Sequence, residues 1–518
     1  MATTHKLLSN LYRDSVSLMQ LSATLAARPG VRHASAVMAT EANLELLRAA
    51  GLSLGEVAAS PNDLLIAIEG EDDALADAMA AAEAALTEAR PRAEDGGGYR
   101  RAPLRSIEMA LGDLPTASLA LISTPGEYAA AEAWKALRLG LHVMLFSDNV
   151  ALEDEIALKR YAREHDLLVM GPDCGTAIVG GIPLGFANVV RRGEIGAVAA
   201  SGTGLQQVTC LIDRLGAGIS QAIGTGGHDL HARVGGITML QGLELLAADP
   251  ATRVIVLISK PPDPEVAARV LDAAARAGKP VVVNFLGADP ARIAGVNLHP
   301  ARTLEDAARI AVGLVEGGTQ DQPTVQDDPD LPEVAPLSPG QRYVRGLYSG
   351  GTFCYEALLL LLTEAFGTVH SNTPLDPDSA LRDVWQSVGH TVIDLGDDQF
   401  TRGRPHPMID QSLRNERILK EAIDPEVAVI LLDVVFGYGA HPDPAAEIAP
   451  VIHKAQSLAA QDGRAIVVVG TVCGTAADPQ GLARQEAALK QAGVLLADSN
   501  AQAVRLAARL AARSGAEG

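Results

Sequence analysis

Short apolar runs rich in Val, Ile and Leu alternate with helix-length amphipathic segments along most of this 518-residue chain. Such alternation predicts βα units, because parallel strands need a crossover connection of helix length between them. Repeated βα units form parallel sheets with helices on both faces, and ligands bind beyond the carboxyl ends of their strands. We therefore expect an α/β protein of several doubly wound, parallel-sheet domains of Rossmann or flavodoxin type. Their predicted strands are Ser118–Ser123, Val143–Ser147, Leu167–Met170, Ile195–Ala200, Val254–Ile258, Val281–Phe285, Tyr343–Tyr348, Val427–Leu432 and Ala465–Val469.

The first 90 residues follow a different pattern. Strands are predicted at Ser35–Met38 and Asp63–Glu69, and helices at Glu41–Ala50 and Glu71–Arg90. This order indicates a small α+β module, which a Gly-rich segment at 95–98 ends.

Breaks in the periodic pattern divide the chain into five parts. Between residues 317 and 340, Asp, Pro and Gln dominate and apolar periodicity is almost absent, which predicts a linker. The length fits three or four domains at roughly 100–200 residues each. The predicted parts are the α+β module at 1–95, doubly wound domains at 110–190 and 193–316, the linker at 317–340, and a last doubly wound domain at 341–518.

The net charge of −21 argues against a nucleic-acid partner, because a phosphate backbone binds to a basic face. It permits small anionic ligands, which backbone N–H groups can hold. The four cysteines have no metal-ligand spacing, so no metal is expected. No apolar run reaches the ~20 residues of a membrane span, and residues 1–20 lack a signal-peptide pattern. We expect a cytoplasmic protein that contacts no membrane and needs no cofactor.

A Gly- and hydroxyl-rich turn follows the predicted strand Ile195–Ala200. It reads Ala200-Ser-Gly-Thr-Gly-Leu-Gln-Gln207 and opens an apolar helix that runs through Leu215. Backbone N–H groups at a helix start are unpaired and lie at the positive end of the helix dipole. We therefore predict a phosphate cradle here; the alternative is an ordinary tight turn capped by Ser or Thr. The candidate ligands are Ser201, Gly202, Thr203 and Gly204.

A second such turn, Gly470-Thr-Val-Cys-Gly-Thr475, follows the strand Ala465–Val469. Two turns in separate α/β units suggest that one anion is held between them. Chance recurrence in a chain with 50 glycines is the alternative. The candidates from this turn are Gly470, Thr471, Cys473, Gly474 and Thr475.

Other polar clusters also follow predicted strands, although such loops are solvated more often than functional. No GxxxxGK[ST] motif occurs and no strand precedes a complete GxGxxG, so neither a P-loop nor a dinucleotide fingerprint is predicted. The remaining candidates are Gly226, Gly227 and His228 in one loop, Arg404 and His406 in another, and Asn149, Asp173 and Cys174 as secondary choices.

The stretch 118–260 resembles the α subunit of succinyl-CoA synthetase. The resemblance is carried by Gly171-Pro-Asp-Cys174, Ser201-Gly-Thr203 and Gly224-Thr-Gly-Gly-His-Asp229. Gly350-Gly-Thr352, Gly437-Tyr-Gly439 and Gly470–Thr475 resemble the carboxyl-terminal ligase domain of the β subunit. The resemblance implies a CoA-binding-like domain at 110–190, an α-type ligase domain at 193–316 and a flavodoxin-type domain at 341–518.

More specific motifs resemble FdrA proteins. They are Tyr12-Arg-Asp-Ser-Val16, Met38-Ala-Thr40, Phe146-Ser-Asp-Asn-Val150, Gly403-Arg-Pro-His-Pro-Met-Ile-Asp410 and Asp478-Pro-Gln480. This resemblance implies one subunit of an oxamate carbamoyltransferase, which interconverts oxamate plus carbamoyl phosphate with oxalurate plus phosphate in anaerobic allantoin catabolism. It also implies two other subunits as partners, and a homo-oligomer is a further expectation.

Three departures from the synthetases bear on the chemistry. Asn297-Leu-His-Pro-Ala301 stands where they have a Gly-His-Ala-Gly phosphohistidine loop, so His299 is expected to carry no phosphate. Ser259-Lys-Pro-Pro262 replaces the Glu-containing turn that orients their histidine. Finally, the ATP-grasp domain that loads the phosphate is missing from this sequence. A substrate that arrives already phosphorylated, such as carbamoyl phosphate, fits these departures.

For such a reaction we assign Lys260 and the two helix starts to neutralise charge on the phosphate. An amide nitrogen is a poor nucleophile, so His228 or His406 is expected to act as a base. Cys174 has no basic neighbour in sequence, so no covalent role is expected for it. The rival functions are an acyl-CoA ligase subunit and a non-catalytic scaffold or regulatory subunit.

Overall fold

The computed structural model describes residues 2–9, 11, 13, 15–40, 43–44, 47–48, 52, 59–60, 63–88, 104–293, 295–317, 331–332, 334–364, 366–402 and 404–516. These residues form two compact units. One unit draws on residues 1–117, 123–125 and 397–410, and the other on 118–122, 126–396 and 411–518.

The first unit contains a three-stranded antiparallel sheet in the order β1-β3-β2. Buried Leu, Ile and Ala side chains of the strands pack against helices α1 and α3. The predicted α+β module is therefore present, but its first strand and first helix were not predicted. The helix expected at 41–50 lies largely outside the described residues. The elements are β1 (Ala2–Leu8), α1 (Ser15–Ala26), β2 (Val31–Met38), β3 (Leu64–Gly70), α3 (Asp72–Glu88), α4 (Ile107–Asp113) and α12 (Asp398–Thr401).

The second unit begins with a three-stranded parallel sheet in the order β4-β5-β6. Its strands and crossover helices lie within a few residues of the predicted ones, because each apolar run is flanked by a clear turn. They are β4 (Leu119–Ile122), α5 (Gly126–Arg138), β5 (His142–Leu145), α6 (Leu152–Glu164) and β6 (Val169–Met170).

A seven-stranded sheet follows, in the order β13-β12-β11-β9-β10-β7-β8. Its five strands from β13 to β10 are parallel, whereas β7 and β8 form an antiparallel extension. This hairpin was not predicted; it joins the seven-stranded sheet and not the preceding three-stranded one. The elements are β7 (Thr176–Val179), β8 (Ile182–Gly185), β9 (Arg192–Ala199), α7 (Gly202–Arg214), β10 (Ile219–Gly224), α8 (Ile237–Ala248), β11 (Val254–Ser259), α9 (Pro264–Ala275), β12 (Val281–Phe285), η1 (Pro290–Arg292), β13 (Leu298–Pro300) and α10 (Leu304–Val315).

The last sheet has six parallel strands in the order β15-β16-β14-β17-β18-β19. The elements are β14 (Tyr343–Tyr348), α11 (Gly351–Thr363), β15 (Val369–His370), η2 (Pro377–Ser379), β16 (His390–Asp394), α13 (Ser412–Ala422), β17 (Val427–Val435), α14 (Pro444–Gln461), β18 (Val467–Cys473), α15 (Leu482–Gln491), β19 (Val494–Ala497) and α16 (Asn500–Ala516).

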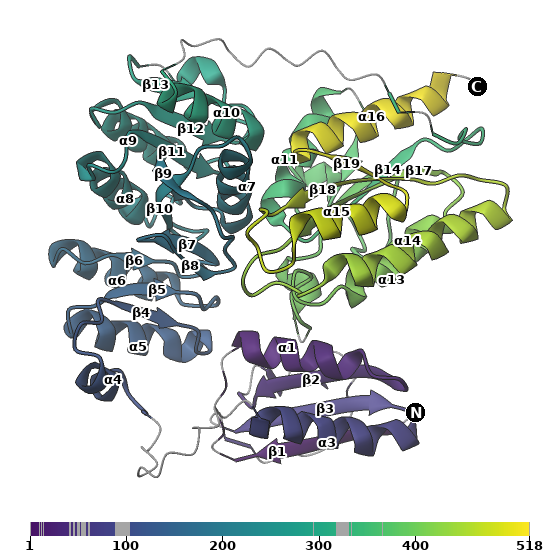
Figure 1. The fold of residues 1–518 in the computed structure, drawn as a ribbon, viewed down its shortest axis with the longest axis horizontal. Helices are drawn as coiled ribbons and strands as arrows, with labels where there is room; N and C mark the ends of the chain where they lie inside the picture. The colour runs from purple at the N-terminus through teal and green to yellow at the C-terminus, as the bar shows by residue number, and fades with distance from the viewer. Residues whose placement is uncertain are drawn as a thin grey trace. The chain divides into compact units, whose positions relative to one another are not determined.

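Helices cover both faces of the two larger sheets, as Figure 1 shows. Helices α8 and α9 lie on one face of the seven-stranded sheet, and α7 and α10 lie on the other. In the six-stranded sheet, α13, α14 and α15 cover one face, and α11 and α16 the other. The strands are therefore buried on both sides, as parallel strands require. The predicted α/β fold class with parallel sheets is confirmed.

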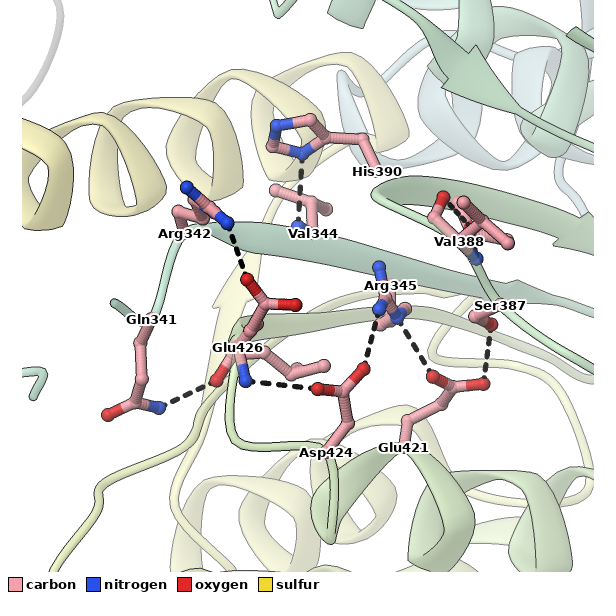
Figure 2. A network of polar contacts seen from close by, with 12 residues as sticks. Gln341, Arg342, Val344, Arg345, Ser387, Val388, His390, Glu421, Asp424 and Glu426 are labelled. Atoms are coloured by element: carbon pink, nitrogen blue, oxygen red, sulfur yellow. Dashed lines mark hydrogen bonds and ion pairs between the residues drawn. The ribbon is translucent and has the colours of Figure 1, made fainter. Parts of the chain in front are cut away.

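A buried ion network holds the strands of the six-stranded sheet at their amino-terminal ends (Figure 2). Arg345 of β14 is 1% exposed and donates to Glu421 Oε2 and Asp424 Oδ2, both at 2.8 Å. Glu421 also accepts from Arg417 and from the Ser387 hydroxyl, each at 2.6 Å. Because buried charges are costly unless they are paired, each partner here depends on the others.

A second set of polar contacts joins the two large sheets inside this unit. Asp478 accepts hydrogen bonds from Asn188 Nδ2 and Val189 N–H, both at 2.8 Å, and from Thr475 N–H at 2.7 Å. The Thr475 hydroxyl donates to the Val189 carbonyl at 2.6 Å. Residues from the two halves of the unit therefore satisfy one another's buried polar groups.

Candidate active site

The segment Gly470–Thr475 does not itself open a helix; the helix expected after Asp478-Pro-Gln-Gly481 follows it. Strand β18 continues to Cys473, and the next helix, α15, begins at Leu482. Thr471, Cys473 and Thr475 are fully buried, and both hydrogen-bonding groups of Thr475 are bonded within the protein. The apolar run Ala465–Val469 looked complete before Gly470, but the strand extends through the small residues that follow.

The carboxyl end of the segment Gly470–Thr475 lies beside the carboxyl-terminal part of α7, whereas Ser201 lies at the amino-terminal end of that helix. Arg214, the last residue of α7, donates to the carbonyls of Val472 at 2.7 Å and Gly474 at 3.0 Å. Ser201 caps the first turn of the same helix. A helix of 13 residues is about 20 Å long. Cys473 also lies beside Cys210 in the body of α7, with the two sulfur atoms 4.0 Å apart, so the structure places this segment along the later turns of the helix and not at Ser201.

The helix start that meets Ser201 is instead that of α11. The Ser201 and Thr352 hydroxyls share a hydrogen bond, although 151 residues separate them in sequence. Ser201 Oγ also accepts from Gly204 N–H at 3.0 Å, as an N-cap residue does. Helices α7 and α11 each have 13 residues, so two full helix dipoles begin side by side. The first N–H groups of each helix have no partner within the helix.

Asp433 fixes the backbone at the start of α11. It is fully buried and accepts from Ser349 N–H, the Ser349 hydroxyl and Gly350 N–H at 2.8–2.9 Å. The guanidinium of buried Arg414 balances its charge, with Nη1 at 2.9 Å from Oδ1.

Lys260 and Asp394 flank the same helix start. A Cβ at Gly351 would overlap Asp394 Oδ2 and would lie 3.5 Å from Lys260 Nζ, so both charged atoms lie beside this glycine. Lys260 Nζ is also 5.8 Å from the centroid of the Tyr355 ring, within the range of a cation–π contact. Lys260 follows β11 and Asp394 ends β16. A cation from one sheet and an anion from the other therefore both border the start of α11.

Ser201 and Lys260 were predicted from the sequence motifs and lie in this candidate site, whereas Thr352, Asp394 and Asp433, which lie there too, were not predicted. Gly350-Gly-Thr352 was visible as a Gly- and hydroxyl-rich turn after the strand Tyr343–Tyr348. The same pattern, a Gly- and hydroxyl-rich turn after a strand, was the basis for predicting Ser201. Asp394 and Asp433 lie within apolar strands, and nothing local distinguishes them from other strand-end carboxylates.

The loop with Gly226, Gly227 and His228 shares this edge of the seven-stranded sheet. Thr225 N–H donates to the Ala199 carbonyl at 2.8 Å, so the loops after β9 and β10 leave the sheet together. Gly226 has φ +82°, and a Cβ there would overlap the Pro172 carbonyl. The segment after β6 also passes the α7 start, since a Cβ at Gly202 would lie 3.3 Å from Thr176 Oγ1.

The secondary candidates lie on loops of the same unit. Asn149 and Asp173 are exposed and have positive φ angles of 53° and 54°, which is uncommon for residues other than glycine. Cys174 is buried, and burial raises the pKa of its thiol to about 12. A thiol held neutral is a poor nucleophile. His299 belongs to the edge strand β13, and burial lowers its pKa.

Arg404 and His406 belong to the other compact unit, with the α+β module. Burial lowers the pKa of His33 on β2, and the positive charge of Arg404 lowers it further. His406 Nδ1 accepts from Met408 N–H at 3.2 Å. The structure therefore groups the 397–410 segment with the amino-terminal module, and Gly403 lies outside the described residues.

Two family models match separate parts of the chain. Residues 1–103 match the family model described as "AllF, heavy metal-associated domain", and residues 347–510 match the CoA-ligase family model. The first description raises the question of a metal. Residues 1–103 contain no cysteine, and no group of three or more potential ligands occurs among the described residues. The chain therefore does not fit a thiolate metal site. Nor does any helix in the described part of the chain have the length and apolarity to cross a membrane.

A relative covers almost the whole chain. The uncharacterized protein YahF of Escherichia coli is 44% identical over 495 residues, which is 95% of both chains. The α subunit of an ADP-forming succinate–CoA ligase of Aquifex aeolicus is 28% identical over 208 residues, 38% of this chain and 63% of that one.

Among solved structures, the dinucleotide-forming acetyl-coenzyme A synthetase 1 of Ca. Korarchaeum cryptofilum aligns with a TM-score of 0.34 and 16% identity, over 82% of this chain and 88% of that one. The near full-length match to YahF and the two family models agree with the resemblance that the sequence motifs carry. The chain belongs to the FdrA family within the succinyl-CoA synthetase-like superfamily.

Proposed function

We propose that this chain is a subunit of an oxamate carbamoyltransferase, which joins oxamate and carbamoyl phosphate to give oxalurate and phosphate, and which acts with two further subunits. The observation that carries the proposal is that Lys260 and Asp394 both border the start of α11, which meets the start of α7 through the Ser201–Thr352 hydrogen bond. The match to the AllF-type amino-terminal model supports a link to allantoin catabolism.

Carbamoyl phosphate has both an anionic group and N–H donors. The two helix starts and Lys260 would neutralise the phosphate, whose negative charge increases as the carbamoyl group leaves. Asp394 would accept a hydrogen bond from the carbamoyl NH₂ group. A site for inorganic phosphate alone has no use for a carboxylate at this position, because like charges repel.

Ser201→Ala tests the proposal in the complex with its partner subunits. The assay contains oxalurate and phosphate and follows the release of oxamate. Loss of one such donor costs a factor of about 100–1000 in rate. Gly202→Val, which closes the helix start, should have a similar effect. Arsenate in place of phosphate should drive irreversible breakdown of oxalurate, because carbamoyl arsenate hydrolyses.

Ser106→Ala is a matched control for the loss of a helix cap. Ser106 caps α4 in the same way, accepting from Met109 N–H at 3.2 Å, so its loss should affect stability and not turnover. If Ser201→Ala and Ser106→Ala leave oxamate release equally intact, the helix starts are not the phosphate site. If the complete complex does not act on oxalurate at all, the proposed function is wrong.

The second candidate is an acyl-CoA ligase subunit, which the match of residues 347–510 to the CoA-ligase model favours. Formation of an acyl-CoA from ATP, CoA and a carboxylate by the same complex would support it. Acid-labile, alkali-stable label on His299 after incubation with phosphodonors would also support it.

A further inference from the structure

A cluster of buried charges lies beneath the His228 loop. Lys159 of α6 is fully buried, and its Nζ donates to Glu155 Oε1 at 2.7 Å, Asp229 Oδ1 at 2.8 Å and the Thr225 carbonyl at 2.9 Å. The three protons of the ammonium group thus have three acceptors. Glu155 and Asp229 are also buried, at 1% and 0% exposure.

The cluster contains one more carboxylate than is needed to balance the charge of Lys159. Asp229 alone balances Lys159, and its oxygens also accept from the Thr238 and Met239 N–H groups at the start of α8. Glu155 adds a second negative charge. Its Oε2 is buried and accepts no hydrogen bond from any described residue, whereas His228 Nδ1 lies 3.5 Å away. An uncompensated buried charge is costly unless a positive group approaches it.

His228 lies between this carboxylate and the solvent. Its side chain is 57% exposed, and Nδ1 faces Glu155, so Nε2 on the other side of the ring is available to a ligand. His231 also faces it, with ring centroids 5.1 Å apart, and the carboxylate of Asp173 lies beside the preceding residue, Gly227. The loop is tied to the one that carries Lys260, because Asp263 N–H donates to the Leu230 carbonyl at 3.0 Å.

We infer that His228 transfers the proton at this site, and that Glu155 is its positioning residue. Glu155 accepts from Nδ1–H, which leaves Nε2 unprotonated and directed outward, and it stabilises the imidazolium that forms when Nε2 takes a proton. The substrate class is a compound with a weakly acidic carboxamide N–H. The identity of that compound as oxamate rests on the proposed function.

The proton and electron pairs can be followed in both directions. In synthesis, the amide nitrogen bonds to the carbonyl carbon of carbamoyl phosphate and gives its proton to Nε2. The bond from that carbon to the phosphate oxygen breaks, and the phosphate keeps the electron pair. In phosphorolysis, a phosphate oxygen attacks the same carbon, the C–N bond breaks, and Nε2–H protonates the departing nitrogen.

Chemical rescue tests the role of His228 in the complete complex. His228→Ala should lower kcat by about 100–10,000-fold, the usual contribution of general acid–base catalysis, with little change in KM for phosphate. Added imidazole should restore part of the rate, because the ring it replaces is exposed. Glu155→Gln should lower kcat without raising KM, and the double variant should be rescued less than His228→Ala.

Glu153→Gln is the matched control. Glu153 is on the same helix, but it is exposed and pairs with Arg233, so its change should leave kcat unaltered. If imidazole fails to rescue His228→Ala and Glu155→Gln turns over at the wild-type rate, the inference is overturned.

A second measurement needs no substrate. ¹⁵N spectra of the histidine-labelled chain at about pH 9, where ordinary imidazoles are neutral, report which ring nitrogen carries the proton. His228, assigned by comparison with His228→Ala, should be in the Nδ1–H form, and Glu155→Gln should shift it to the Nε2–H form. If this holds in a complex that ignores oxalurate, only the proposed function fails. If oxalurate is turned over, but imidazole does not rescue His228→Ala and Glu155→Gln does not change the tautomer of His228, only this inference fails.

Discussion

At the scale of single residues, His390 links the packing of the six-stranded sheet to pH. Its Nδ1 accepts from Val344 N–H at 3.2 Å, a contact that needs a neutral ring (Figure 2). Burial, together with the charges of Arg345 and Arg342, lowers its pKa to about 4. In the unfolded chain the imidazole has its ordinary pKa of about 6.5.

This difference predicts an acid-dependent loss of stability. Above pH 6.5 the ring is neutral in both states; as pH falls toward 4, the unfolded chain takes up a proton first and unfolding becomes easier. His390→Asn keeps an acceptor for Val344 but cannot titrate. Urea unfolding at several pH values should therefore show a shallower loss for this variant. His453→Asn, at an exposed position, is the control, and equal slopes for the wild type and His390→Asn would contradict the prediction.

Cys174 gives a second prediction. With its pKa raised to about 12 by burial, only about one thiol in 10,000 is ionised at pH 8, so the native chain should resist alkylation by iodoacetamide. Mass spectrometry should find the label on Cys174 only after denaturation, and Cys174→Ala should keep its activity. Rapid labelling of Cys174 in the native protein would show that the thiol is reactive.

At the scale of elements, Glu356 joins three helices. It lies on α11, accepts from Leu304 N–H at the start of α10, and accepts from Asn500 Nδ2 at the start of α16, both at 2.8 Å. Burial raises its pKa to about 7. The two helix starts favour the carboxylate, but the loss of water has the larger effect.

Glu356→Gln should therefore change how stability depends on pH. A carboxyl with a raised pKa stabilises the fold fully below its unfolded pKa of about 4.5, and this contribution is lost as pH rises through about 7. The neutral amide removes that loss, which is at most about 3 kcal/mol. The unfolding free energies of wild type and variant should diverge between pH 5 and 7.5 in the variant's favour. Glu364→Gln, at an exposed position near the end of the same helix, is the control. If the difference in unfolding free energy between wild type and Glu356→Gln does not change with pH, the prediction is wrong.

The elements also show what sequence patterns can predict. Val281–Phe285 and Tyr343–Tyr348 were predicted to the residue, because Val and aromatic residues favour strands and clear turns flank both segments. Strand β1 and the β7–β8 hairpin were missed, because polar or Gly-rich strands depend on pairing with distant strands. The site behaves in the same way: local chemistry identified Ser201, whereas its contact with Thr352 is set only by tertiary packing.

At the scale of the whole molecule, Asp478 joins the two large sheets of the second unit, so its substitution tests how strongly they are coupled. Asp478→Ala leaves the donors of Asn188, Val189 and Thr475 without their acceptor, which should cost about 3 kcal/mol or more. Calorimetry should show the single transition of this unit broadening or splitting, because the sheets lose a shared contact.

Asp443→Ala is the comparison for this change. Asp443 also bonds to side chains of the carboxyl-terminal half, Arg484 and Gln485, but it does not reach the other sheet. It should lower stability modestly and leave the transition cooperative. Equal effects of the two variants would mean that Asp478 does not couple the sheets.

The contact between Ser201 and Thr352 also has a consequence for synthesis on the ribosome. Ser201 emerges 193 residues before Asp394, so at about 5–20 residues per second the first half of the site waits about 10–40 s for the second. The start of α7 lacks its hydroxyl partner until residue 352 has emerged, and it lacks the neighbouring carboxylate until residue 394 has emerged. A nascent chain arrested before residue 350 should therefore fold its seven-stranded sheet and still have only half of a binding site.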